Sequence, residues 1–188
     1  MNDGSAPFDL SGLGLLGLNP LLIEFATYWS ALPKHGLIPN RSDFQPSKIP
    51  KLLPNITIHE LLRPDFIQLR LVGTEIENIY SQKMTGKNYL DFVDSSGRVA
   101  ISRAIHLACE HPMGMVFHTK STTQKGTILN RQSIAFPMRD SEGLPRLVYF
   151  YTVTTSPMPY ADQQRDQLVI NNVSIRFVDI GAGIPDTT

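Results

Sequence analysis

Cysteine is almost absent from this chain of 188 residues, and neither sign of charge is in excess. The single cysteine, Cys109, cannot form a disulfide within the chain, which is typical of a reducing compartment, and we expect the cytoplasm. Basic and acidic residues number 17 each, so the formal net charge is +0. This balance argues against binding of nucleic acid or of an anionic membrane through a basic surface, and we expect neither partner.

Uninterrupted hydrophobic segments of membrane-spanning length are also missing. The apolar stretch from Leu10 to Ile23 is broken by glycines and by Pro20. Its upstream flank carries Asp3 and Asp9 and no lysine or arginine, which is the wrong charge for a signal peptide. We therefore expect a soluble protein.

An amphipathic helix is predicted near the start of the chain. Asn19 and Pro20 form a typical helix start, and Pro33 ends the run. Apolar side chains recur at helical spacing between them. This face could pack on its own domain, or it could form the interface of a homodimer, because aromatic residues are enriched in interface cores. The candidate interface residues are Leu21, Phe25 and Trp29.

Prolines follow in residues 33 to 54, which predict an extended connector that Phe44 and Ile49 attach to the domain. Residues 1–54 thus comprise an N-terminal arm, the amphipathic helix and the connector. At the other end, residues 156–188 form a C-terminal extension. It contains one more candidate strand, with alternating apolar residues at Val173, Ile175 and Phe177.

Residues 55–155 have the pattern of one α+β domain. Two strand-like runs come first, then a helical middle, then three strand-like runs. Alternation places Ile67, Leu69 and Leu71 on one face of the second strand, and the longest helix is predicted from about Ser95 to Glu110. The five predicted strands cover Asn55–Leu62, Asp65–Val72, Met113–Lys120, Thr127–Met138 and Arg146–Thr154.

The apolar faces of these elements are expected to meet between the sheet and the helices. On the long helix, small alanines share an arc with Ile101 and Ile105, which suggests close approach to the sheet or to a cavity. The candidate cavity-lining residues are Leu69, Leu71, Ile76, Tyr80, Ile101, Ile105, Met115, Phe117, Phe136, Tyr149 and Tyr151.

Motifs that bind a cofactor or a metal are missing. Cys109 lies in Leu107-Ala-Cys-Glu110, which departs from the Asn-Cys-Arg-Phe-type motif of flavin-adduct photosensors. His106 is placed opposite the apolar arc and is expected to face solvent, so a haem is not expected. His106 and His111 are five residues apart and on different faces, and a second cysteine is lacking. We expect no cofactor and no metal.

Four short motifs in order, together with the closing segment, resemble one known family. The closing segment is Arg176-Phe-Val-Asp-Ile-Gly181. The four are Pro39-x-Arg-x-Asp-Phe-x-Pro46, Ile49-Pro-x-Leu-Leu-Pro54, Arg70-Leu-Val-Gly-Thr74 and Thr85-Gly-Lys87. They resemble the PAS-like family common in alphaproteobacteria. The resemblance implies a PAS-like five-stranded antiparallel sheet with helices across one face, here preceded by the N-terminal amphipathic helix. It implies sensing or protein interaction, and it transfers no catalytic residue.

The main functional hypothesis is a non-catalytic PAS-like sensory or protein-interaction module of bacterial signalling. It would bind a small molecule of unknown identity or a signalling protein, and would act through that partner chain or through its own oligomerisation. One rival is a structural adaptor with a filled core and no ligand. Another is a small α+β enzyme, which convergent polar side chains in the cavity would favour.

Overall fold

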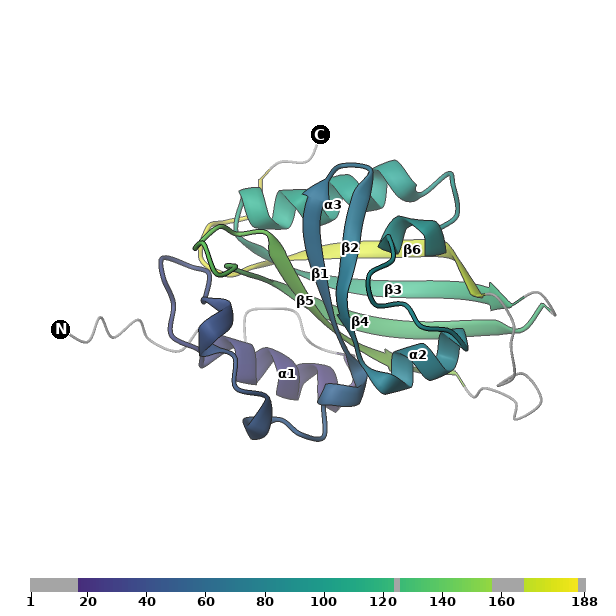
Figure 1. Ribbon diagram of the computed structural model, residues 1–188, viewed down its shortest axis with the longest axis horizontal. Coiled ribbons are helices and arrows are strands. Elements are labelled where there is room, and N and C mark those ends of the chain that lie inside the picture. Colours follow the sequence, from purple (N-terminus) through teal and green to yellow (C-terminus); the bar gives the residue numbers. More distant parts are fainter. Residues whose placement is uncertain (1–16, 124–125, 157–167, 186–188) are drawn as a thin grey trace.

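The protein is built on one antiparallel sheet of six strands in the order β2-β1-β5-β4-β3-β6 (Figure 1). The computed structural model describes residues 17–123, 126–156 and 168–185. It confirms the predicted α+β class and the order of two strands, helices and three strands. The strands are β1 (Ile56–Arg63), β2 (Phe66–Val72), β3 (Met113–Thr123), β4 (Ile128–Met138), β5 (Leu147–Thr154) and β6 (Leu168–Asp179).

The strand count is the first correction, because the sheet has six strands where five were expected. The sixth, β6, contains the candidate strand of the C-terminal extension and pairs with β3 along its whole length. The C-terminal extension and the central residues 55–155 therefore share one sheet.

The described α-helices are α1 (Pro20–Ser30), α2 (Thr74–Tyr80) and α3 (Arg98–Glu110), and of these three only α1 has a side-chain cap at its start. At the start of α1, the side-chain oxygen of Asn19 accepts a hydrogen bond of 3.0 Å from the backbone N–H of Leu21. In the described ranges, no helix combines the length and the apolar character that crossing a membrane requires.

Helix α1 covers one face of the sheet, on the opposite side from α3 (Figure 1). Its buried residues pack against β4 and β5: Trp29 stacks on Phe136 with ring centroids 4.4 Å apart, and Phe25 stacks on Tyr151 at 5.6 Å. Stacked aromatic pairs add to the stabilisation from area burial alone. The apolar face of α1 is thus occupied within its own chain.

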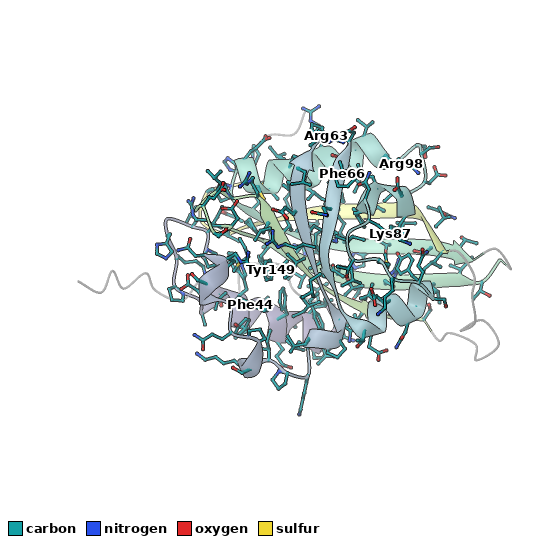
Figure 2. The ribbon with its side chains drawn as sticks, in the orientation of Figure 1. Phe44, Arg63, Phe66, Lys87, Arg98 and Tyr149 are labelled. Atoms are coloured by element: carbon teal, nitrogen blue, oxygen red, sulfur yellow. The ribbon has the colours of Figure 1, made fainter. Side chains whose placement is uncertain are left out.

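The connector lies over the same face in three short 3₁₀ turns, η2 (Arg41–Asp43), η3 (Pro46–Lys48) and η4 (Leu53–Asn55). Phe44 packs on Tyr149 with ring centroids 5.0 Å apart, and the two labelled side chains lie near each other in Figure 2. Ile49 is buried. Both contacts confirm the predicted attachment of the connector.

Gly73 explains one of the family motifs physically. It follows β2, and its N–H donates a 2.8 Å hydrogen bond to the carbonyl oxygen of Ile56. A Cβ at this position would overlap the Pro54 carbonyl group, which is backbone and cannot easily move. The motif therefore needs glycine for close approach, since the backbone φ of −67° suits any residue.

The second face of the sheet packs against α3, α2 and the 3₁₀ turn η5 (Tyr89–Phe92). Ile101 and Ile105 of α3 are buried against this face, among a group that includes Met115 and Phe117. The predicted phase of the long helix is correct at these positions. Ser102 of the same helix is also buried, and its hydroxyl donates to the Pro64 carbonyl oxygen at 2.5 Å.

A β-bulge at Arg70 corrects the prediction for Leu71. Leu69 pairs with His59, and Leu71 pairs with Ile58, so Arg70 is an extra residue in β2. The extra residue reverses the alternation. Leu71 turns to the outside and is 45% exposed, whereas Val72 is buried.

Candidate functional site

An interior cavity lies on the second face of the sheet, next to α2 and η5. About 50 Å³ of it is open to water-sized molecules, several times the ~10–15 Å³ that one water needs. Its apolar lining residues are Leu69, Ile76, Met84, Phe117, Phe150 and Ile170. Its polar lining residues are Thr57, His59, Tyr80, Tyr89, Thr119, Arg131, Ser133 and Thr152.

The structure separates the predicted lining residues into four groups. Leu69, Ile76, Tyr80 and Phe117 do line the cavity. Three others are buried on the same face without lining it, namely Ile101, Ile105 and Met115. Leu71 is outside, as described above. Three lie on the opposite face in the cluster that includes α1, namely Phe136, Tyr149 and Tyr151.

The placement of Phe136, Tyr149 and Tyr151 corrects the prediction, and the error has a simple cause. Successive side chains of a strand point to opposite faces, and both faces of β5 are apolar. Alternation groups Tyr149 with Tyr151 and Val148 with Phe150, but it cannot say which group faces the cavity. The position of α1 decides this, because α1 takes the face of Tyr149 and Tyr151.

Arg131 is the principal cavity residue that the sequence analysis did not identify. It lies on β4 and is only 5% exposed. Its Nη2 donates hydrogen bonds to the hydroxyls of Tyr80, at 2.7 Å, and Ser121, at 2.8 Å. Its Nε is buried and has no hydrogen-bond partner among the residues that the structure describes. In the sequence, Arg131 alternates with Ser133 and Ala135, on the face of the strand opposite Phe136. This pattern could have identified Arg131 as a residue of the cavity face.

His59 is the second buried polar residue of the cavity. It is 2% exposed and lies between Phe150 and Tyr89, with ring centroids 4.2 and 4.5 Å away. Its Nε2 is 3.3 Å from the Thr57 hydroxyl, and its Nδ1 has no partner within the described ranges. Burial lowers the pKa of His59 to about 3, so its imidazole is neutral near pH 7.

The remaining polar groups supply hydroxyls rather than charges. Burial raises the pKa of Tyr89, so its phenol remains protonated and can donate a hydrogen bond. Ser133 and Thr152 bond to each other at 2.8 Å. The described lining contains no carboxylate and no thiol. The cavity therefore combines one fixed positive charge with several hydrogen-bond donors.

The cysteine and the histidines that were weighed as cofactor ligands lie elsewhere. Cys109 is buried, and burial raises the pKa of its thiol to about 12. His106 of α3 is half-buried, with Nδ1 2.9 Å from the Ser102 carbonyl oxygen, and does not line the cavity. Over the described ranges, no group of three or more His, Cys, Asp and Glu side chains could hold a metal ion.

Two larger hollows are open to solvent at the surface. One of about 730 Å³ runs along α3 and includes His106 and the highly exposed Val99. The other, of about 850 Å³, lies along α2 and includes Thr154 and Ser156. Neither contains a buried charge, and the interior cavity is therefore the stronger candidate site.

Comparison with known proteins gives one family match, and residues 19–149 match the family model described as "PAS domain". A search of curated proteins found no match.

Several solved structures are similar over part of the chain. An RNA-binding light-oxygen-voltage receptor shares 20% identity with a TM-score of 0.45, over 65% of this chain and 35% of that one. VqmA bound to DPO shares 13% identity with a TM-score of 0.45, over 58% and 56%. A light-oxygen-voltage protein of Rhodobacter sphaeroides shares 8% identity with a TM-score of 0.44, over 63% and 73%. The chain thus matches about a third of the first of these proteins.

Proposed function

Because the chain belongs to the PAS domain family, we propose that it is a sensory module whose interior cavity binds a small molecule and whose output passes to a signalling partner. The observation that carries the proposal is the buried Arg131, which lines the cavity and forms no salt bridge with a described residue. A buried charge is costly unless an opposite charge or strong hydrogen bonds compensate it. A bound molecule would add such contacts.

The polar lining supports a ligand-binding module over a ligand-free adaptor, since an adaptor needs only a filled apolar core. It also supports binding over catalysis. With a pKa of about 3, His59 is a poor general base near neutral pH, and the described lining offers no carboxylate or thiol for that role. The proposal is therefore a non-catalytic sensor, which we place in the cytoplasm.

Helix α2 is the element best situated to transmit ligand binding. Ile76 and Tyr80 reach the cavity from this short helix, and Tyr80 is hydrogen-bonded to Arg131. A ligand that moves Arg131 would change the position of α2, and a partner chain could recognise that change. A homodimer would have to use exposed residues such as Leu21, which is 42% exposed, because Phe25 and Trp29 are buried.

Native mass spectrometry tests the proposal directly. Protein freshly purified from its native host should carry an added mass that is released on denaturation. Thr119→Phe, which fills the cavity from β3, should lower this occupancy. His118→Phe is the matched control, because it places the same side chain on the exposed face of the same strand.

The contrary result is also clear. A wild-type mass equal to that of the bare chain, together with an unchanged melting temperature across a panel of small metabolites, would reject the sensory cavity and favour the adaptor.

A further inference from the structure

Arg131 brings into the cavity a positive charge that no described side chain neutralises. An arginine side chain carries a positive charge, and none of the salt bridges within the described ranges includes Arg131. Its partners Tyr80 and Ser121 are neutral hydroxyls. A buried charge of this kind is costly unless an opposite charge or strong hydrogen bonds compensate it.

The groups around Arg131 also favour a negatively charged ligand. His59 is neutral because of its burial, so it adds no second positive charge and no negative one. Tyr89 stays protonated and can donate. The hydroxyl of Tyr80, which lines the cavity, accepts from Arg131 and keeps its own proton to donate. The described lining therefore has one positive charge, several hydroxyls that can donate and no negative charge, and this combination favours an anion over a neutral molecule.

We propose that the cavity binds a compact organic monocarboxylate, whose carboxylate group pairs with Arg131 and whose apolar part contacts Ile76, Met84 and Phe117. This inference rests on the proposed function of the cavity as a ligand site. A guanidinium group binds a carboxylate more strongly than a neutral amide, because charge and hydrogen bonding both contribute. The open space of about 50 Å³ limits the ligand to a short chain.

The test compares each acid with its own amide, using wild-type protein at constant ionic strength. Butyrate and butyramide have nearly the same size, but only butyrate is charged. We expect butyrate to raise the melting temperature in a saturable manner, and isothermal titration calorimetry to show at least tenfold weaker binding of butyramide. Acetate, propionate and hexanoate, each with its amide, complete the series and define the preferred length.

Variants then assign the binding to Arg131. Arg131→Gln should weaken butyrate binding at least tenfold and remove the preference over butyramide. Arg131→Lys, which keeps the charge without the guanidinium group, should retain part of the preference. Arg103→Gln on the exposed side of α3 is the matched control and should bind butyrate as wild type does. Circular dichroism confirms that each variant is folded, and the acid–amide comparison in wild type needs no variant.

The outcomes separate this inference from the proposed function. Equal binding of acid and amide, equal responses of wild type and Arg131→Gln, or no binding of any acid in the series would overturn the carboxylate contact. A released native mass that proves to be a neutral molecule would overturn it too, while supporting the cavity as a ligand site. Absence of both a native ligand and any binding would reject the two together.

Discussion

His59 shows how a single residue links the interior to pH. Its imidazole is enclosed by Phe150 and Tyr89, and burial lowers its pKa to about 3. In the unfolded chain the pKa returns to about 6.5. Between these values the unfolded state binds one more proton than the folded state, so the His59 contribution favours unfolding progressively as the pH falls. Above about pH 7 this contribution is constant.

The first prediction follows from this loss of stability at low pH. The unfolding free energies of wild type and His59→Gln are compared at pH 7 and at pH 4.5. Lowering the pH should destabilise wild type relative to His59→Gln by about 2–3 kcal/mol, since each pKa unit is worth about 1.4 kcal/mol. Urea denaturation at several pH values measures it. His118→Gln, an exposed position, serves as the control. Parallel curves for wild type and His59→Gln would show that His59 is not buried in its neutral form.

At the scale of elements, α1 is the clearest case of a helix whose role depends on what it packs against. Its aromatic face is typical of an interface, and the structure places that face on β4 and β5 of the same chain. Of the three candidate interface residues, only Leu21 remains exposed. A short helix is marginal alone in water, so its stability comes from this packing.

The second prediction concerns α1. Phe25→Ala should lower the unfolding free energy by about 3–5 kcal/mol, the usual range for a fully buried aromatic residue, because Phe25 is 0% exposed. Leu21→Ala on the exposed side should cost less than about 1 kcal/mol. Chemical denaturation measures both. A neutral Phe25→Ala would mean that α1 does not pack on its own sheet in solution, and light scattering of wild type would then test a dimer.

Considered as a whole, the molecule joins segments from both ends of the sequence to the central sheet. α1 contributes to the cluster on one face, and β6 contributes to clusters on both faces through Val178 and Ile170. The regions expected as an N-terminal segment and a C-terminal extension therefore share buried residues with the central strands. Such sharing predicts cooperative unfolding.

The third prediction makes this cooperativity measurable. Trp29 is the single tryptophan of the chain and reports on α1, whereas far-ultraviolet circular dichroism is dominated by the sheet and the other helices. The two signals should give the same urea midpoint and the same slope, as two-state unfolding requires. A fluorescence transition at clearly lower urea would instead show that α1 and the connector detach before the sheet unfolds.

Local chemistry in the sequence was enough to determine the elements. The Asn19–Pro20 start places α1, the proline-rich stretch excludes long elements between residues 33 and 54, and strand alternation identifies the strands of the central domain. The family motifs add the fold, and Gly73 shows that such a motif can mark a close backbone contact. These features depend on neighbouring residues, and sequence patterns record neighbours well.

Only the tertiary structure decided which faces meet and what lies between them. Both faces of β5 are apolar, so alternation could not separate the cavity face from the face that α1 covers. The bulge at Arg70, which turns Leu71 outward, depends on pairing with β1 and leaves no local signal. The contact of Arg131 with Tyr80 joins residues 51 positions apart. Such a site arises when distant strands and helices come together, and for that physical reason the sequence predicted a domain of this class but not its buried charge.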